Sequence, residues 1–365
     1  MKSIPALLLC LLLAQPFYAQ NGHYRLLVGT YTKPDKSQGI YSYDVDLNTG
    51  TFTQKSVAKA SNPSFLVLTP DKKFVYSVNE GSESSAANAF SFDEATANLT
   101  FINRSLTNGS GPCYIAATKN HVFTANYNGG SISVFRRNAD GSLSDLVQKI
   151  QHVGGSIDKN RQNEPHVHQV FVSPDQKYVL ANDLGTDKVT VYKYDSGAPS
   201  EVLVPWDTLT VKLGSGPRHL TFSKDGKRIY LIQEMDGTLS VIGMKDGKIK
   251  LIQETSVIRD NGKGWAADIH LSPDGKFLYA TNRAPANNIT CFAVAKDGRL
   301  QYKQQVSTKG DGPRNFSLTP DGRYLFVAHQ STDNIVLFKR DVKTGSLTDT
   351  GKRIDVGSPV CLVFY

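Results

Sequence analysis

Cysteine is scarce in this sequence, with four among 365 residues, and one of the four lies in the apolar N-terminal segment. The remaining three are too few to form a disulfide framework in a chain of this length. Cys113, Cys291 and Cys361 each lie among strand-forming residues. We therefore expect all three to be buried free thiols.

Hydrophobic runs long enough to cross a bilayer, which takes roughly 20 apolar residues, are also missing. The apolar run from Ile4 to Leu13 is shorter; it follows Lys2 and precedes Ala19. A charged start, a short apolar region and a small residue at the cleavage point are typical of a secretory signal peptide. We expect residues 1–20 to be cleaved, leaving residues 21–365 as a periplasmic or secreted protein without membrane attachment.

The sequence also lacks a concentrated patch of one charge. It has 41 Lys and Arg against 33 Asp and Glu, but the lysines are scattered, mostly in turns such as 71–73 and 225–227. A nucleic-acid-binding protein would gather its basic residues in a patch or arm. No nucleic-acid partner is therefore expected, and the oligomeric state is left open.

Several motifs of catalysis and cofactor binding do not occur. The sequence has no glycine-rich phosphate loop before a helix and no Gly-x-Ser-x-Gly nucleophile elbow. His166 and His168 share one side of an extended chain, but only Glu164 lies near them in sequence and no Cys/His ligand set accompanies them. We expect no metal and no cofactor.

An internal repeat dominates what is present. One unit is an apolar run, a turn such as Pro-Asp-Gly-Lys, and a second apolar run that ends in polar residues, which is the pattern of two antiparallel strands. Copies of this unit occupy residues 65–80, 115–127, 170–183, 220–234, 269–283 and 316–330. Each copy is followed by a second hairpin, as at 131–143 and 238–248. Four strands recurring with a period near 50 residues are typical of a β-propeller.

The number of blades follows from the two ends of the chain. Residues 26–56 supply three strands of a unit that lacks its first strand, and residues 359–365 form a lone first strand. Pairing them closes the ring and removes exposed sheet edges. The sequence therefore predicts an all-β, seven-bladed propeller of four-stranded antiparallel blades, without a second domain.

The repeat also predicts which side chains meet at one mouth of the central channel. First and second strands of a blade are antiparallel, so the start of one lies beside the end of the other. Charged residues and histidines at these places concentrate in blades four to six: His166, His168, Asp183, Arg218, His219, Glu234, Asp268, His270 and Arg283. Such a cluster is expected of a site for a small anion.

Not every residue of the cluster is assigned a function. Asp268 and His270 are expected to brace neighbouring blades, and Asp175, Asp225, Asp274 and Asp321 to be turn residues. Long charged side chains are costly to bury without a partner. We therefore favour function for Arg218, Glu234 and Arg283, followed by His168.

Several strings in the sequence carry a family resemblance: 125–134, 166–168, 214–222, 265–270 and 281–283. The specific ones are Gly-Ser-Gly-Pro-Arg-His and Trp-Ala-Ala-Asp-Ile-His. They resemble the lactonase family of seven-bladed propellers, which includes cycloisomerase-type 6-phosphogluconolactonases and is related to 3-carboxy-cis,cis-muconate lactonizing enzyme. The resemblance covers essentially the whole mature chain.

The resemblance implies lactone chemistry on a small anionic lactone or organic acid. The catalytic roles fall on Glu234, His168 (or His166), Arg218 and Arg283. The arginines would grip a phosphate or carboxylate or stabilise the oxyanion, and Glu234 or His168 would act as general base. The expected substrate-binding residues are His166, His219, Asp183, Tyr127 and Arg314.

Two alternatives to a sugar lactonase remain open. One is a muconate-type lactonizing enzyme, and the other is a non-catalytic exported propeller that binds a partner. The polar insertion at 154–164 is long enough to serve as a lid or a partner contact. An export signal also disagrees with a phosphorylated cytoplasmic substrate, and favours unphosphorylated sugar lactones or other organic acids.

Overall fold

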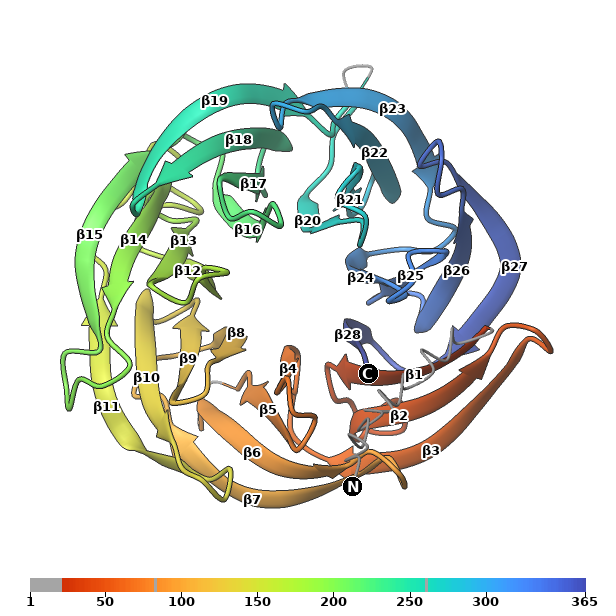
Figure 1. The fold of residues 1–365 in the computed structure, drawn as a ribbon, viewed down its shortest axis with the longest axis horizontal. Helices are drawn as coiled ribbons and strands as arrows, with labels where there is room; N and C mark the ends of the chain where they lie inside the picture. The colour runs from red at the N-terminus through yellow and green to blue at the C-terminus, as the bar shows by residue number, and fades with distance from the viewer. Residues whose placement is uncertain (1–21, 82–83, 260–261) are drawn as a thin grey trace, which may run out of the picture.

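The computed structural model describes residues 22–81, 84–259 and 262–365, so the predicted signal peptide lies outside the described residues. The described residues form seven four-stranded antiparallel sheets, arranged like blades around a central axis (Figure 1). The predicted seven-bladed propeller is confirmed. None of the described segments is a helix with the length and apolar character needed to span a membrane.

Each blade has its first strand nearest the axis and its fourth at the rim (Figure 1). The first strands are β28 (Pro359–Phe364), β4 (Leu66–Leu68), β8 (Pro112–Ala117), β12 (Val167–Val172), β16 (Pro217–Phe222), β20 (Ala266–Leu271) and β24 (Pro313–Leu318). The second strands are β1 (His23–Thr30), β5 (Phe74–Asn79), β9 (His121–Asn126), β13 (Tyr178–Asp183), β17 (Arg228–Gln233), β21 (Phe277–Asn282) and β25 (Tyr324–His329). The third strands are β2 (Gly39–Asp46), β6 (Ala86–Asp93), β10 (Ser131–Arg137), β14 (Lys188–Tyr194), β18 (Thr238–Lys245), β22 (Asn288–Val294) and β26 (Asn334–Arg340). The fourth are β3 (Thr51–Lys59), β7 (Asn98–Leu106), β11 (Leu143–Gln151), β15 (Leu203–Thr210), β19 (Lys248–Ser256), β23 (Leu300–Ser307) and β27 (Leu347–Asp355).

The two ends of the chain close the ring as predicted. β28 pairs antiparallel with β1, with Leu26 opposite Phe364 and Val28 opposite Leu362. The C-terminus accordingly lies beside β1 in Figure 1. Because β1 is paired on both edges, with β28 and with β2, it offers no free edge for pairing with another chain.

Neighbouring blades are held together by buried apolar faces. Between the first and last blades, Leu26 and Val28 pack against Phe326 and Leu337, all with no exposed surface. Alternate residues of a strand share one face, so each blade can present apolar residues to both neighbours. Burying such a side chain contributes about 1.5–3 kcal/mol. The three described cysteines are buried and free, as predicted.

The turns between first and second strands repeat one hydrogen-bonding pattern. In blade four, Ser173 donates to Asp175 Oδ1 at 2.6 Å, and the Lys177 amide donates to the same oxygen at 3.2 Å. Asp225, Asp274 and Asp321 accept equivalent bonds in the next three blades. These aspartates are turn residues, as the sequence indicated.

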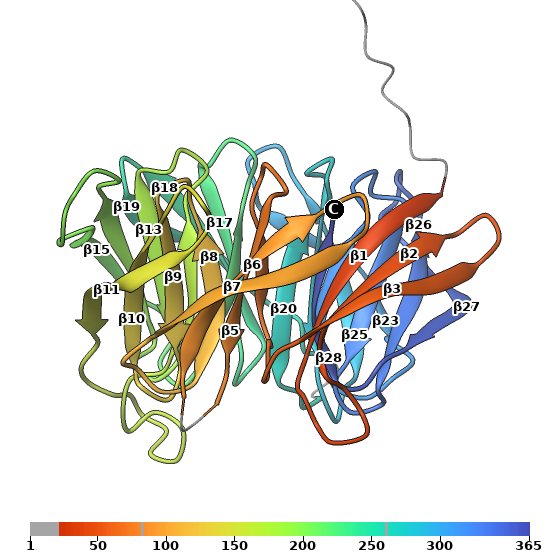
Figure 2. The ribbon, with the colours of Figure 1, turned by 90° about the horizontal axis from the view of Figure 1, so that it is seen from below.

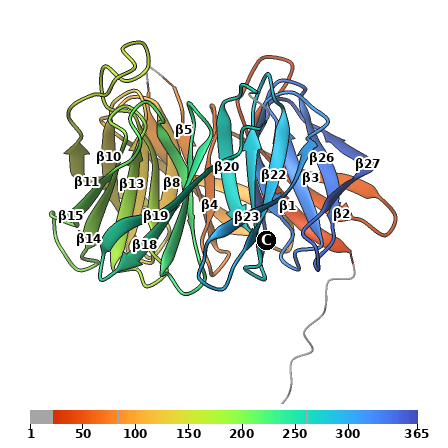
Figure 3. The same ribbon diagram turned by 90° about the horizontal axis from the view of Figure 1, so that it is seen from above.

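The two faces of the ring differ. Seen from the side, a yellow-green loop between β11 and β12 and the red loop between β1 and β2 stand out from one face, whereas the chain ends at the other (Figures 2 and 3). The yellow-green loop contains the insertion at 154–164. It therefore lies on the face where first strands begin and second strands end.

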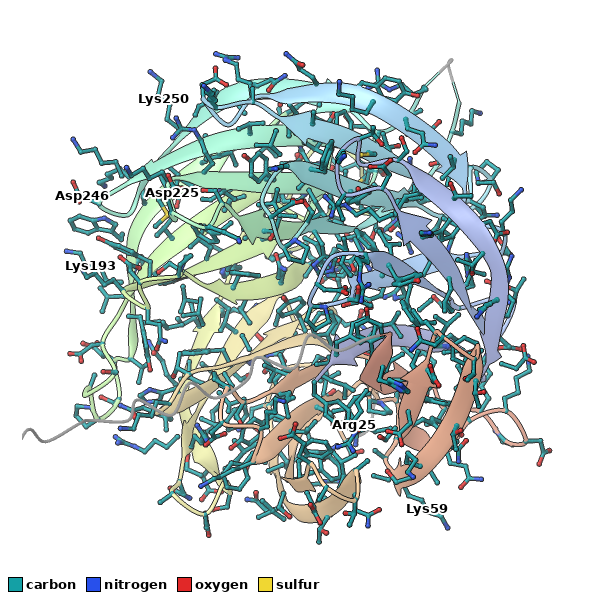
Figure 4. The ribbon with its side chains drawn as sticks, turned by 45° about the vertical axis from the view of Figure 1, so that its right-hand side comes forward. Arg25, Lys59, Lys193, Asp225, Asp246 and Lys250 are labelled. Atoms are coloured by element: carbon teal, nitrogen blue, oxygen red, sulfur yellow. The ribbon has the colours of Figure 1, made fainter. Side chains whose placement is uncertain are left out.

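Charged side chains surround the outside of the ring. Lys59 lies on one side of the ring, whereas Lys193 and Lys250 lie on the other side, where Asp225 and Asp246 are also found (Figure 4). All of these side chains are exposed. The labelled basic residues thus do not form a single patch, in agreement with the scattered lysines of the sequence.

Candidate active site

A recurring irregularity at the start of the first strands turns one side chain of each towards the channel mouth. The register shifts between Pro112 and Tyr114 in β8, and between Pro217 and His219 in β16. A β-bulge leaves the extra residue unpaired and re-aims its side chain. The residues at these positions are Cys113, His168, Arg218 and Arg314 in blades three, four, five and seven.

These side chains meet the ends of the second strands in a cavity of about 450 Å³. Three of the lining residues carry a guanidinium and two carry a carboxylate. The lining residues are Glu80, Cys113, Tyr127, Asn128, Arg161, His168, Glu234, Trp265, Arg283 and Arg314. The sequence repeat therefore predicted much of the lining, because it aligned the two sets of strand ends.

Glu234 follows β17 and is the most heavily paired group of the cavity. Its Oε2 accepts from Arg218 Nε at 3.0 Å and from Arg283 Nη2 at 2.9 Å, while Oε1 accepts from Arg161 Nη2 at 2.8 Å. Burial would raise the pKa of Glu234, but the adjacent charges of Arg283 and Arg218 hold it well below its usual range. Glu234 is therefore a carboxylate shared by three cations, and a weak base.

The three arginines reach Glu234 from different parts of the fold. Arg218 comes from the bulge of β16, is 1% exposed, and also donates to the Ala267 carbonyl. Burial, together with the charges of Arg314 and Arg283, lowers the pKa of Arg218 to about 10, so it remains charged at neutral pH. Arg283 follows β21 and donates from Nε to the Trp265 carbonyl at 3.3 Å.

Arg161 comes from the insertion between β11 and β12 and was not predicted as a site residue. Its Nη2 also donates to the Tyr127 hydroxyl at 3.0 Å, and its guanidinium lies 5.1 Å from the ring of Trp265. Its side chain is 32% exposed, more than that of Arg218 or Arg283. The only sequence signal was the length and polarity of the insertion, because Arg161 falls outside the repeat.

His168 lies beside the Glu234 cluster and lines the cavity. Its Nε2 is 3.9 Å from Glu234 Oε2, and its Nδ1 is 3.8 Å from Cys113 Sγ. Burial and the positive charge of Arg218 hold the pKa of His168 well below its usual range. The imidazole is consequently neutral at pH 7. If it accepted a proton, the positive charge would lie next to the carboxylate of Glu234.

His166 does not line the cavity. It donates from Nδ1 to the Tyr127 carbonyl at 3.0 Å, and its ring stacks on that of Tyr127 at 4.5 Å. The choice between the two histidines, which the sequence left open, thus has a geometric basis: His168 faces the cavity and His166 supports Tyr127.

Asp183, predicted to bind substrate, also lies away from the cavity. In blade five the amide of Glu234 donates to the Gly216 carbonyl, and the corresponding donor in blade four is Leu184, which donates to His166. Leu184 therefore occupies the position equivalent to Glu234, and the sequence alignment of this blade was wrong by one residue. A shift of one residue reverses the face on which a strand side chain lies. Asp183 is fully buried and accepts the backbone amide of His166 at 2.8 Å.

Aromatic rings and a buried histidine–aspartate hydrogen bond lie next to the cavity. Phe65 stacks on Tyr114 at 3.9 Å, and His219 meets both rings edge-on. His219 donates from Nδ1 to Asp268 at 2.8 Å. Burial lowers the pKa of His219 to about 4. His219, predicted to bind substrate, therefore belongs to this neighbouring layer, which borders a constriction of about 10 Å³.

Asp268 connects three blades from this layer. Its Oδ1 accepts from His219 of blade five, and its Oδ2 accepts from Asn315 of blade seven at 2.6 Å and from His270 of its own strand at 2.9 Å. The bracing role expected for Asp268 and His270 agrees with these bonds. Among the described residues, no three His, Cys, Asp or Glu side chains are grouped so that they could hold a metal ion.

Comparison with known proteins identifies the family. The family model described as "Lactonase, 7-bladed beta-propeller" matches residues 25–364. A 6-phosphogluconolactonase of Formosa agariphila is 35% identical over 93% of this chain and 99% of its own length, and one of Bacillus subtilis is 34% identical over 92% and 97%.

Solved structures agree with this match. A putative 6-phosphogluconolactonase of Bacteroides fragilis superposes with a TM-score of 0.91 and 42% identity, covering 95% of this chain and 99% of that one. A periplasmic gluconolactonase of Pseudomonas aeruginosa gives a TM-score of 0.86 and 36% identity over 94% and 99%. The chain therefore belongs to the lactonase family of seven-bladed β-propellers.

Proposed function

We propose that this protein hydrolyses a sugar lactone to the corresponding sugar acid. The observation that carries the proposal is a cavity lined by Glu234, Arg161, Arg283 and the neutral imidazole of His168, with the buried Arg218 paired to the same carboxylate. The names of the relatives, 6-phosphogluconolactonase and periplasmic gluconolactonase, support the same chemistry.

In the proposed reaction the guanidinium groups of Arg218 and Arg283 bind the carbonyl oxygen of the lactone. Attack by water converts this oxygen into an oxyanion, and preorganised cations stabilise such a charge more than the neutral carbonyl. Glu234 holds both guanidinium groups in place, since each already donates to its Oε2. Its role is to position the arginines rather than to accept a proton.

His168 is the proposed general base. Because its pKa lies well below the usual value, the imidazole is unprotonated at neutral pH and can accept a proton from the attacking water. Glu234, 3.9 Å away, stabilises the imidazolium that forms. When the tetrahedral intermediate collapses, the bond from the acyl carbon to the ring oxygen breaks and the alkoxide takes this proton. The products are a carboxylate and a hydroxyl group, with one proton released to solvent at neutral pH.

We also propose that the protein is exported. Residues 1–20 are proposed to be a cleaved signal peptide and residues 21–365 the mature domain, which would work in the periplasm or outside the cell. The periplasmic gluconolactonase among the solved relatives supports this compartment.

A proton-release assay tests the proposed function. The purified protein is supplied with glucono-δ-lactone, 6-phosphoglucono-δ-lactone and a muconolactone, with spontaneous hydrolysis subtracted. We expect opening of at least one sugar lactone, and loss of that activity in His168→Gln. Failure to open any lactone above background would exclude the proposal, and opening of the muconolactone alone would point to the lactonizing enzymes.

A further inference from the structure

The side of the cavity formed by blades one, two and seven contains a second carboxylate, Glu80. The hydroxyl of Tyr31 donates to both of its oxygens, at 3.1 and 3.0 Å, and the hydroxyl of Ser64 donates to Oε2. Glu80 lines the 450 Å³ cavity. Its two protein partners leave lone pairs of the carboxylate available to a ligand.

The charge of Glu80 is not matched by a direct ion pair. Among the described residues, no Lys, Arg or His nitrogen lies within 4.0 Å of its carboxylate, in contrast to Glu234. Arg314 is in the same situation, because no described carboxylate lies within that distance of its guanidinium, which sits 5.4 Å from the ring of Tyr31. Arg314 and Glu80 line the same cavity.

A free acceptor and a free donor on one wall favour a particular kind of ligand group. A hydroxyl group can donate to the carboxylate of Glu80 and accept from the guanidinium of Arg314. A phosphate or carboxylate would be attracted by Arg314 but repelled by Glu80, since both would be negatively charged. An apolar group would leave both charges without partners, which is costly in a partly buried site.

We propose that Glu80, Tyr31, Ser64 and Arg314 form a subsite for hydroxyl groups of the substrate, so that the enzyme prefers unphosphorylated sugar lactones to phosphorylated ones. This inference rests on the proposed lactonase function and makes Glu80 a specificity-determining residue. It also accounts for an exported protein in a family whose curated members include 6-phosphogluconolactonases.

The test compares glucono-δ-lactone with 6-phosphoglucono-δ-lactone, which differ in one phosphate. We expect the wild type to have the higher kcat/KM for glucono-δ-lactone. Glu80→Gln keeps the size of the side chain but removes its charge, and should shift the ratio of the two kcat/KM values towards the phosphorylated lactone by about 10- to 100-fold. The shift should appear mainly in KM, since Glu80 does not touch the groups proposed to react.

Glu201→Gln is the matched control. Glu201 is exposed between β14 and β15, on the face opposite the cavity. The substitution therefore removes the same charge without changing the subsite. It should leave the ratio unchanged. A wild type that prefers the phosphorylated lactone, or a Glu80→Gln variant with the wild-type ratio, would overturn the subsite.

Calorimetric binding of gluconate and 6-phosphogluconate separates this inference from the proposed function. The wild type should bind gluconate more tightly, and Glu80→Gln should lose this preference. If no lactone is opened, the proposed function fails, and the binding preference still decides for or against the subsite.

Discussion

Glu80 and Glu234 occupy equivalent positions in blades two and five but have different surroundings. The amide of each donates to the segment that leads into the first strand of its own blade, to Asn62 for Glu80 and to Gly216 for Glu234. In each blade the residue two positions after this acceptor bonds the carboxylate, Ser64 in one case and Arg218 in the other. The repeat thus places two carboxylates at one mouth of the channel. Glu234 is paired with arginines, whereas Glu80 keeps lone pairs that a ligand could use.

Equivalent positions in the repeat therefore do not give the two glutamates equivalent surroundings. Glu234 is bonded by three guanidinium groups, one of them from outside the repeat, whereas Glu80 is bonded by two neutral hydroxyls. Charged partners neutralise a carboxylate and lower its basicity, while hydroxyl donors leave its net charge in place. Substitutions of each glutamate and of its partners should therefore have different effects on catalysis.

The largest effect is expected for Glu234→Gln. Without the carboxylate, Arg218 and Arg283 lose the group that positions them, and the imidazolium of His168 loses its neighbouring charge. We expect kcat for the preferred lactone to fall by about 10³-fold, a loss typical of a missing electrostatic group. Initial-rate kinetics measure it, with urea unfolding as the check on the fold. Glu80→Gln should change kcat by less than about tenfold; equal losses in the two variants would remove the distinction between the glutamates.

A smaller effect is expected for Arg314→Gln, which removes the cation opposite Glu80. Loss of one or two charge-assisted hydrogen bonds should raise KM for a hydroxylated lactone by about 10- to 100-fold, with little change in kcat. Steady-state kinetics separate the two constants. A drop in kcat with unchanged KM would instead assign Arg314 to the transition state.

Arg161→Gln should have a weaker effect, because Arg161 reaches the site from the insertion and its side chain donates to Glu234 Oε1 and the Tyr127 hydroxyl but not to Glu234 Oε2. Arg218 and Arg283 remain on Oε2. We expect kcat/KM to fall by about tenfold, the size of one charge-assisted hydrogen bond. Lys159→Gln, an exposed cation of the same insertion, serves as the control; an equal loss there would indicate an effect of the loop as a whole.

The smallest change is expected with pH. Because the pKa of His168 is lowered, its neutral form persists as the pH falls below the ordinary histidine value of 6.5. Activity that depends on neutral His168 should therefore stay nearly constant from pH 8 to pH 6.5 and decline only at more acid pH. A kcat/KM profile checks this, and an acid limb centred at or above pH 6.5 would contradict the assigned base.

The fold and the position of the candidate site could be predicted from the amino-acid sequence alone. Turn residues between alternating apolar runs specify antiparallel strands. A blade that lacks its first strand at one end of the chain and a lone first strand at the other end predict a closed ring. The same periodicity placed His168, Arg218, Glu234 and Arg283 at one mouth, because it relates residues that are about 50 positions apart.

Tertiary structure decided the remaining features, since they depend on departures from the repeat. The bulges select which residue faces the cavity, and the one-residue offset in blade four puts the buried Leu184, rather than Asp183, at the position equivalent to Glu234. Arg161 enters from an insertion that has no counterpart in other blades. Whether a carboxylate is surrounded by cations or by hydroxyls depends on side chains from three separate segments, and only the folded ring brings them within bonding distance.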